Sequence, residues 1–439
     1  MVDLSVMLAG VKCRTPIGVQ PTAPIQPGLL DPERHADLLL RTVDAGAGYV
    51  VIPAFFYSKE LSKQAEEMKR KGIPMARIPG TRVMKVETPG FGIDGFCHIG
   101  YTTPVALTWL EGAPRLTEKV KRNVPRDVPV IVNLIGPGAD LEGWANAGKR
   151  CEELGADLIE LNLSSPMPFA TSWAVDAFFT NNLPSSYVGA LVQVTDFPNK
   201  VGQVTKAVVD AVRVPVGVKI SPETGFPELI RLAKTLKEAG ASFITAINMA
   251  YGYMPPDIFQ KGKPLWPYLD GNPGAGIHGN CLRLILYKYV AEISRHLPAL
   301  DVIATGGLMT PEHFIESIMF GAKATGTCTG VYCGGISMIR KSIDFLEKYM
   351  ENQGYASIED FRGMALKYIK DPKDINWRLG EIRAMVNEGL CNGCGACIDT
   401  ICLASYLENG IAKIRRDDCN GCGICVIRCP MGARRIVDQ

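Results

Sequence analysis

Eight of the chain's fourteen cysteines lie in two short runs between residues 391 and 429. The second run, CNGCGICVIRCP, has the spacing C-x2-C-x2-C-x3-C-P, which is the spacing of bacterial [4Fe–4S] sites. The first run, CNGCGACIDTIC, is one residue longer between its last two cysteines, and Leu403 stands where proline would follow. Short spacings let several thiolates reach iron from one tight loop, and the glycines between them let N–H groups approach sulfur. The two runs therefore predict iron–sulfur binding and one-electron transfer.

Structural zinc is the alternative interpretation of these cysteines. Zinc ribbons usually pair two short C-x2-C knuckles across a longer gap, whereas here three cysteines share one run, which favours iron and sulfur. The tail is similar to two-cluster ferredoxins, in which the fourth cysteine of each run serves the other cluster. That resemblance implies two [4Fe–4S] clusters with these ligand sets: Cys391, Cys394, Cys397 and Cys429, and Cys419, Cys422, Cys425 and Cys402.

The composition is that of a globular protein of more than one domain. At 439 residues the chain is too long for one ordinary domain, but a barrel enzyme with an appendage would fit. The net charge of +2 argues against a nucleic-acid-binding protein, which usually carries a basic excess. The sequence has no basic-then-apolar leader and no apolar run of about 18 residues that could span a membrane. We therefore expect a cytoplasmic protein.

Strand-like apolar runs recur along the first 350 residues, each followed by a helical pattern. The runs are PIGVQ (16–20), YVVIPAF (49–55), VPVIVNL (128–134), ADLIELNL (156–163), VPVGVKI (214–220), ASFITAIN (241–248), DVIATGG (301–307) and AKATGTC (322–328). Continuously apolar strands are typical of a parallel sheet that is buried on both faces. We expect an α/β fold with a (β/α)8 TIM barrel in residues 1–350, a linker or helical connection in 351–385 and a ferredoxin-like domain in 386–439. A doubly wound sheet is the alternative, because sequence patterns do not prove closure.

Polar residues and glycine turns end several of these runs. The polar residues are Asn133, Asn162, Lys219 and Asn248. Glycine turns follow the last two runs, TGGL (305–308) and TCTG (327–330). In a barrel the chemistry lies at the carboxyl ends of the strands, and glycines after strands seven and eight commonly bind phosphate. Each feature alone could be an ordinary turn, but together they predict a phosphate-bearing cofactor.

These motifs resemble the dihydroorotate and dihydropyrimidine dehydrogenase family. The chain is most similar to the bacterial dihydropyrimidine dehydrogenase subunits that join an FMN barrel to a C-terminal two-cluster ferredoxin domain. The likeness covers nearly the whole chain and includes ELNLSSP, VKISP, AIN and ATGG, as well as the cysteine runs.

The resemblance implies an FMN site. Residues that would contact the isoalloxazine ring or lie beside it are Gln20, Asn133, Asn162, Lys219 and Asn248, and residues whose backbone would hold the phosphate are Gly279, Gly306, Gly307, Thr329 and Gly330. Lys219 would stabilise the reduced, anionic flavin.

Four positions depart from the family pattern, and all four are apolar here. Pro53 replaces a lysine, Met249 replaces a hydroxyl residue, and Met167 replaces an asparagine. Val194 lies near the place of the proton-donating cysteine, and the loop 167–197 contains no cysteine at all. A polar group of a pyrimidine that is left unpaired in a closed site costs about 1–3 kcal/mol. We therefore expect a less polar substrate than a pyrimidine.

The proton donor has several candidates. Ser165 occupies the place of the family's catalytic serine or cysteine, although Ser-Ser-Pro can simply shape a turn. His278 replaces a serine and titrates near neutrality, although a packed histidine is the alternative. Tyr251 and Tyr253 follow Asn248 in a segment that could reach the pocket. Arg82 could meet a substrate anion, or could simply be solvated.

Three functions remain open from the sequence. The first is an FMN and iron–sulfur oxidoreductase that transfers hydride to or from a C=C bond conjugated to a carbonyl, in an apolar and cyclic or aromatic-derived substrate. The second is a dihydropyrimidine dehydrogenase subunit that reduces uracil or thymine, and the third is an electron-transfer subunit without turnover. No G-x-G-x-x-G follows a strand, so we expect electrons from a partner subunit of the FAD/NAD(P)H type or from a ferredoxin. The family precedent implies a homodimer.

Overall fold

The fold was analysed in a computed structural model of the chain. It describes residues 2–21, 31–56, 70, 82–88, 92–99, 112–135, 140–164, 197–253, 256–264, 274–375 and 382–438. The chain divides into two compact units, Met1–Val86 with Gly95–Lys367, and Glu87–Asp94 with Tyr368–Gln439. Each unit is described by itself below.

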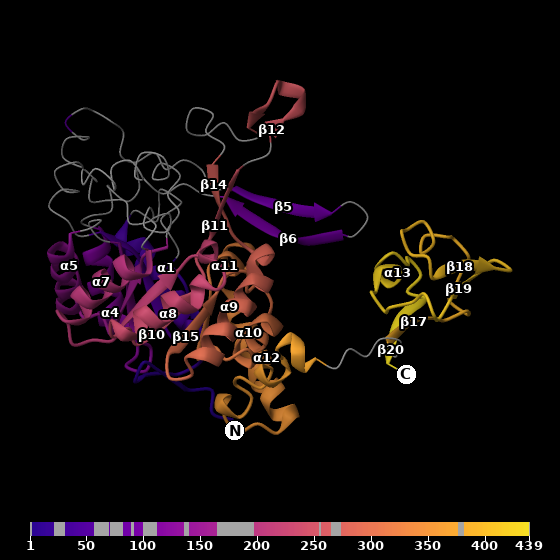
Figure 1. Ribbon diagram of the computed structural model, residues 1–439. Coiled ribbons are helices and arrows are strands. Elements are labelled where there is room, and N and C mark those ends of the chain that lie inside the picture. Colours follow the sequence, from indigo (N-terminus) through magenta and orange to yellow (C-terminus); the bar gives the residue numbers. More distant parts are fainter. Residues whose placement is uncertain are drawn as a thin grey trace. The chain divides into compact units, whose positions relative to one another are not determined.

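The first unit is built on a closed barrel of parallel strands (Figure 1). Around the barrel the strands are β3 (Ile17–Val19), β4 (Val50–Phe56), β7 (Val130–Ile135), β8 (Leu158–Asn162), β9 (Val216–Ile220), β10 (Phe243–Ala246), β15 (Asp301–Thr305) and β16 (Ala324–Thr327). The last strand pairs with the first through Thr325 and Ile17, which closes the barrel. The predicted (β/α)8 fold is therefore confirmed, and the doubly wound alternative is wrong.

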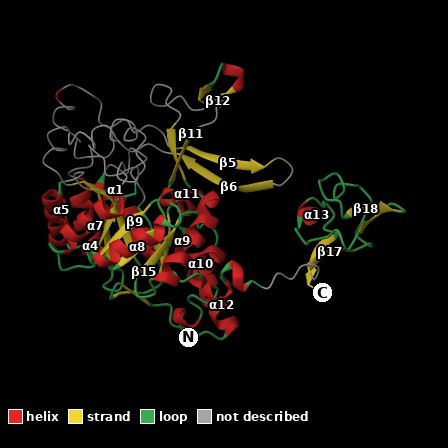
Figure 2. Cartoon of the chain, viewed as in Figure 1, coloured by secondary structure: helices red, strands yellow, loops and turns green. Residues whose placement is uncertain are grey.

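Helices surround these strands (Figure 2). They are α1 (Pro32–Asp44), α4 (Gly112–Asn123), α5 (Leu141–Glu153), α7 (Phe197–Val209), α8 (Glu228–Glu238), α9 (Arg283–His296), α10 (Pro311–Met319), α11 (Thr329–Gly334) and α12 (Ser337–Gln353). Helix α5 shows why they form: the Asp140 carboxylate caps its first turn by accepting from the Gly143 N–H at 2.9 Å. Its buried residues are Trp144, Ala147, Gly148 and Cys151, and their spacing of three and four places them on one face.

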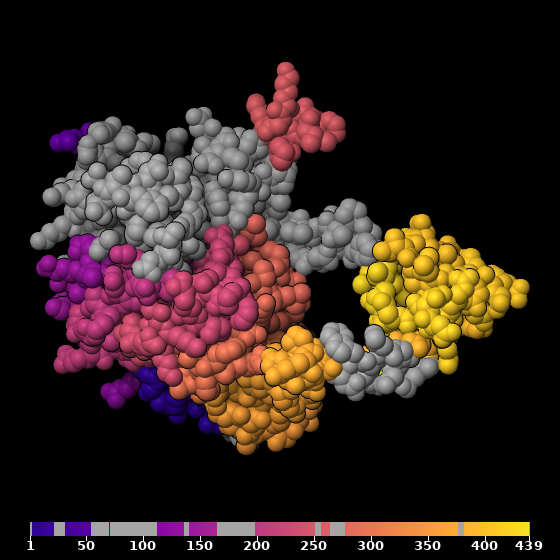
Figure 3. Space-filling model, viewed as in Figure 1, coloured from indigo at the N-terminus to yellow at the C-terminus, as the bar shows by residue number. Residues whose placement is uncertain are grey.

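Short antiparallel hairpins extend the barrel. They are β1 (Val6–Leu8) with β2 (Val11–Cys13), β5 (Arg82–Thr88) with β6 (Gly92–Ile99), β11 (Ala250–Tyr253) with β14 (Gly274–Ile277), and β12 (Pro256–Asp257) with β13 (Lys263–Pro264). The β12–β13 segment projects from the surface in the space-filling view (Figure 3). Among the described residues, no helix is long and apolar enough to cross a membrane.

Residues 354–367 pack on the barrel, although the sequence analysis placed them in a linker. Ile358 and Phe361 are 1% and 0% exposed and belong to the barrel's own apolar core. The ring of Phe361 stacks on Tyr355 with the centroids 5.3 Å apart. The first unit thus continues to Lys367, because two large apolar side chains of this segment need the barrel to cover them.

The C-terminal part of the second unit consists of two antiparallel strand pairs and one helical turn. Strands β17 (Ile382–Val386) and β20 (Arg434–Asp438) form one pair, β18 (Ser405–Glu408) and β19 (Ile411–Ile414) form the other, and α13 (Ile424–Ile427) lies between β19 and β20 in the sequence. Its buried apolar cluster consists of Ala384, Cys397, Ala412 and Cys425. Two of these four residues are predicted iron ligands, so very little ordinary core remains.

Candidate active site and iron–sulfur sites

One pocket of the barrel unit lies at the carboxyl ends of several barrel strands. Predicted cofactor or catalytic residues that line it are Gln20, Lys219, Asn248, His278, Gly279, Gly306, Gly307 and Thr329. Six of them lie at or just after the ends of β3, β9, β10, β15 and β16, which are far apart in the sequence, and His278 and Gly279 directly follow β14. The closed barrel brings these ends together, as the positions of the strand-end motifs predict.

Lys219 is held at the pocket by a chain of buried side chains. It is 7% exposed, and its Nζ donates to Gln20 Oε1 at 3.2 Å. The Gln20 Nε2 donates to the Tyr49 hydroxyl at 3.3 Å, and that hydroxyl donates to the Thr325 carbonyl at 2.9 Å. Burial raises the pKa of Tyr49, which therefore remains a neutral donor. The chain fixes one ammonium group at the pocket, and the sequence analysis missed Tyr49.

The predicted asparagines form a second chain. Asn248 Nδ2 donates to Asn162 Oδ1, and Asn162 Nδ2 donates to Asn133 Oδ1, each at 3.2 Å. The Ser164 hydroxyl joins by donating to Asn162 Oδ1 at 3.1 Å. Among the described residues that line the pocket, only Asn248 belongs to this chain. Asn133 and Asn162 therefore support the amide of Asn248 from beneath.

Glu160 anchors the asparagine chain and was also missed. It is 0% exposed, and its carboxylate accepts from Asn133 Nδ2 and from the Thr245 hydroxyl, both at 2.5 Å. A buried carboxylate is stable only when hydrogen bonds replace its water. It fixes which way the first asparagine amide points, and through it the rest of the chain. The signal in the sequence is a single acidic residue inside the run LIELNL (158–163).

The glycine turns form a cradle for an anion. Gly306 and Gly307 have φ values of +114° and +85°, and a Cβ on Gly307 would lie 2.7 Å from the Gly279 carbonyl oxygen. Among the described residues, none accepts from the N–H groups of Gly306, Gly307 or Thr329. Unpaired backbone N–H groups on residues that line one pocket suit a phosphate. The N–H of Gly330, in contrast, already donates to the Thr327 hydroxyl at 3.1 Å.

The proton-donor candidates are only partly described. His278 lines the pocket and is partly exposed. Tyr251 and Tyr253 lie in β11, but the structure describes only their backbone, and the same holds for Arg82 in β5. Ser165 lies outside the described residues.

Apolar groups lie beside the polar ones. Met249 lines the pocket, and its N–H donates to Asn248 Oδ1 at 2.9 Å. Pro53 is buried in β4. Cys328 also lines the pocket, and burial raises its pKa to about 11 although the charge of Lys219 acts in the opposite direction. The departures at Met167 and Val194 lie outside the described residues.

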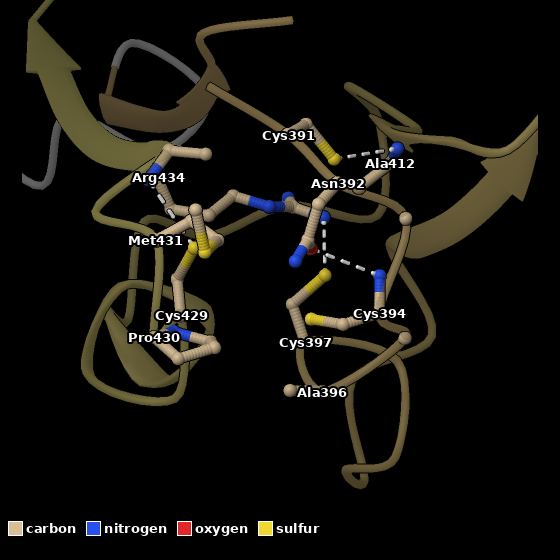
Figure 4. Close-up of a pocket in the computed structure, with 13 residues that line it drawn as sticks. Cys391, Asn392, Cys394, Ala396, Cys397, Ala412, Cys429, Pro430, Met431 and Arg434 are labelled. Carbon is tan, nitrogen blue, oxygen red and sulfur yellow. Dashed lines mark hydrogen bonds between the residues drawn. The ribbon is translucent and has the colours of Figure 1, made fainter.

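A pocket of the second unit brings together one predicted set of iron ligands. Cys391, Cys394, Cys397 and Cys429 line it, and the Arg434 side chain extends into the space between them (Figure 4). N–H groups donate to the sulfurs of this set: Ala412 N to Cys391 Sγ at 3.4 Å, and Ala433 N to Cys429 Sγ at 3.2 Å. Backbone hydrogen bonds from Ala412 and from Gly393 to the sulfur of Cys391 hold the pKa of this thiol below its usual value. Four thiols with N–H donors aimed at them fit an iron–sulfur cluster.

The second set repeats part of this pattern. Its residues are Cys419, Cys422, Cys425 and Cys402. Ala384 N donates to Cys419 Sγ at 3.4 Å, and the Ser405 hydroxyl lies 3.8 Å from Cys402 Sγ. No group of three His, Cys, Asp or Glu side chains in the described parts of the chain is arranged to hold a single metal ion.

Comparison with known proteins identifies the family of the chain. The model of the dihydroorotate dehydrogenase family matches residues 110–350, which is more than half of the chain. The chain belongs to this family. A 4Fe–4S binding domain matches residues 412–435, which include the second cysteine run but not the first. Both matches agree with the resemblance found in the sequence.

Curated relatives agree with this family. The NAD-dependent dihydropyrimidine dehydrogenase subunit PreA of Escherichia coli (strain K12) is 24% identical over 401 residues, which cover 90% of this chain and 84% of the relative. The catalytic subunit of dihydroorotate dehydrogenase B (NAD(+)) of Thermoplasma acidophilum is 25% identical over 311 residues, 68% of this chain and 92% of the relative. The corresponding subunit of Pyrococcus abyssi is 30% identical over 241 residues, 55% of this chain and 70% of the relative. The chain is therefore an oxidoreductase that acts on CH–CH groups, in a family that implies FMN, and it carries a 4Fe–4S binding motif.

Proposed function

We propose that the chain transfers hydride to or from a C=C bond conjugated to a carbonyl, in an apolar and cyclic or aromatic-derived substrate that is not a pyrimidine. Electrons pass through two [4Fe–4S] clusters to or from FMN. A partner subunit of the FAD/NAD(P)H type, or a ferredoxin, supplies or takes these electrons. We propose a homodimer that works in the cytoplasm, where thiols stay reduced.

The FMN proposal is supported by the donors around the barrel pocket. The N–H groups of Gly306, Gly307 and Thr329 would hold the phosphate, because no described residue accepts a hydrogen bond from them. Lys219 and Asn248 would hold the polar edge of the ring, since both line the pocket and are fixed by hydrogen bonds. When bound, FMN exchanges single electrons on one side of a reaction and hydride on the other.

The substrate proposal depends on one observation: apolar residues, among them Ile247, Met249 and Leu308, line the pocket beside its polar residues. Met249 lines the pocket next to Asn248, and Pro53 is buried in β4 where the family resemblance implies a lysine. Each N–H or C=O group of a pyrimidine that faced such a wall would lose its hydrogen bond to water without replacement, at about 1–3 kcal/mol. An apolar ring with a single carbonyl avoids most of that cost.

The iron–sulfur proposal comes from the two cysteine sets. Each set has an N–H donor on its first cysteine at 3.4 Å, from Ala412 in one and Ala384 in the other. Clusters change by one electron, whereas hydride carries two, so a flavin between clusters and substrate couples the two kinds of transfer. This division of labour accounts for both parts being in one chain.

The proton that accompanies hydride transfer needs a donor at the carbon next to the reacting one. We propose His278, because it lines the pocket and because histidine is the side-chain type best suited to give a proton near neutral pH. Ser165 and Tyr251 remain further candidates, and replacing each by a residue without a proton to give would separate the three. The donor is the residue whose replacement makes proton transfer the slowest step of the reaction.

A dihydropyrimidine dehydrogenase is the second candidate function, and the similarity to the PreA subunit of Escherichia coli favours it. An electron-transfer subunit without turnover is the third, and the retained Lys219 and Asn248 argue against it.

An anaerobic experiment separates the three. The purified protein is reduced with limiting dithionite, and its visible spectrum is followed after addition of uracil, thymine, cyclic enones or enoyl thioesters. We expect reoxidation by an enone or enoyl thioester and none by uracil. Reoxidation by uracil would restore the pyrimidine function, and reoxidation by no small molecule would favour the electron-transfer subunit.

A further inference from the structure

The two antiparallel strand pairs of the second unit contact the cysteines in the same way. In the β17–β20 pair Ala384 pairs with Ile436, and in the β18–β19 pair Ala412 pairs with Leu407. The N–H of each alanine donates to the first cysteine of the opposite run, Ala384 to Cys419 and Ala412 to Cys391, both at 3.4 Å. The two halves of this unit are therefore equivalent at these positions, and a difference between them is informative.

One equivalent pair differs strongly. Two residues after each alanine, Val386 pairs with Arg434 in one strand pair and Ile414 pairs with Ser405 in the other. Arg434 and Ser405 are both buried, at 4% and 5% exposed. One half of the unit thus places a permanent positive charge where the other half places a small neutral hydroxyl.

The side chain of Arg434 lines the cysteine pocket, and some of its N–H donors are unpaired. Its Nη2 donates to Cys397 Sγ at 3.0 Å, and the side chain lines the same pocket as Cys391, Cys394 and Cys429. Its Nε and Nη1 are buried and have no hydrogen-bond partner. A buried guanidinium without an acidic partner is unfavourable unless a negative group lies beside it. Thiolates and sulfides of a cluster are such a group, so the arginine fits a loaded site.

Reduction adds one negative charge to a cluster, and a fixed positive charge with N–H donors to sulfur favours that reduced form. We propose that Arg434 raises the reduction potential of the cluster held by Cys391, Cys394, Cys397 and Cys429 above that of the other cluster. This inference depends on the proposed assignment of two clusters to the two cysteine sets.

The consequence is an order between the clusters. The charge of Arg434 also acts on Cys402 and Cys425, but its hydrogen bond goes to Cys397 of the first set. Ser405 offers the second set only a neutral hydroxyl 3.8 Å from Cys402 Sγ, so that set gains less stabilisation. The first electron from a reductant should therefore go to the cluster beside Arg434. With this order, a single electron in the unit would reside mainly on the cluster beside Arg434.

The test is an EPR-monitored redox titration of the full-length protein that contains FMN and clusters. Arg434→Gln should lower the higher of the two cluster potentials by at least a tenfold change in the reduction equilibrium, about 59 mV for one electron. The lower potential should move less. Arg434→Lys, which keeps the charge but loses the planar fork, should give a smaller shift. Arg435→Gln is the matched control, because this neighbour on the same strand is exposed and should leave both potentials unchanged.

Other results would overturn the inference. Unchanged potentials in Arg434→Gln, or a shift confined to the lower potential, would contradict it. If Arg434→Gln loses a cluster, the Arg434→Lys variant becomes the test. A potential in that variant equal to that of the unchanged protein would contradict the inference. Loss of a cluster from both variants would assign the arginine to structure instead. Iron analysis of the unchanged protein separates this result from failure of the proposed function, since a single cluster would remove the two-cluster assignment itself.

Discussion

In the barrel, polar side chains at and behind the pocket hydrogen-bond to one another, whereas in the second unit the sulfurs depend on the iron that they would ligate. Glu160, Asn133, Asn162 and Asn248 form a continuous hydrogen-bonded chain inside a large apolar core. In the other unit, two of the four residues of the buried apolar cluster are themselves predicted iron ligands, and a buried arginine keeps two donors unpaired. The difference indicates that hydrogen bonds among its own residues hold the barrel site, whereas the cysteine unit depends on the iron and sulfur that it would bind.

Removal of iron should separate the two regions most strongly. A chelator with an oxidant should unfold most of residues 382–438, because their own apolar core is too small to hold them. The barrel strands should stay folded. Hydrogen exchange followed by mass spectrometry measures both regions in one sample. Protection that persists in β17 and β19 after iron is gone would break the comparison.

Lys219→Met tests the barrel side. The variant loses a charge-assisted contact of about 1.5–3 kcal/mol to the flavin, so the Kd for FMN should rise about 10- to 100-fold. The quenching of FMN fluorescence on binding measures the Kd. Lys206→Met, on the exposed face of α7, is the control and should bind FMN as before. Equal affinities for the two variants would remove Lys219 from the flavin site.

Gly307→Ala tests the phosphate cradle. The added Cβ would lie 2.7 Å from the Gly279 oxygen and 2.9 Å from the Arg283 nitrogen, both backbone atoms, so the turn must shift. We expect a loss of stability of about 1–3 kcal/mol and a several-fold weaker affinity for FMN. Gly225→Ala is the matched control, because Gly225 also has a positive φ of +68° but open space around it. An FMN affinity lowered equally in both variants would point to backbone strain rather than to the cradle.

Glu160→Gln should have the smallest effect on FMN binding, because Glu160 is not among the residues that line the pocket. The amide keeps one acceptor but places N–H donors against the donor of Asn133 or Thr245, so the free energy of unfolding should fall by about 1–3 kcal/mol. Denaturant unfolding of the barrel, followed by tryptophan fluorescence, measures this change. The exposed Glu238→Gln on α8 should change it by less than about 0.5 kcal/mol. No difference between these two variants would mean that the asparagine chain needs no anchor.

The barrel and its strand-end residues could be predicted because their signals are local. Buried parallel strands are continuously apolar, so Lys219 and Asn248 stand out where such runs end, and the glycines of TGGL mark the turn after β15. Glu160 and Tyr49 were missed because their roles depend on partners from other strands. Residue Glu160 accepts from Thr245, 85 residues away, and Tyr49 donates to Thr325, 276 residues away.

The cysteine unit was predictable in its ligand types but not in its asymmetry. The spacing of the runs predicts the ligands, whereas Arg434 looks like one of two adjacent arginines in a short charged tail. Only the pairing of β20 with β17 turns it inward while Arg435 faces solvent. The end of the barrel unit at Lys367 was likewise hidden, because the packing of Phe361 depends on tertiary contacts.

The most direct test of the account compares two rate constants. Anaerobic rapid mixing of the reduced protein with 2-cyclohexenone and, separately, with uracil gives the second-order rate constant for reoxidation of the flavin by each. We predict that the enone reacts at least about 100-fold faster, which corresponds to the loss of one or two hydrogen bonds by uracil against the wall at Met249. Uracil reacting as fast as the enone, or faster, would contradict the proposal of an apolar substrate.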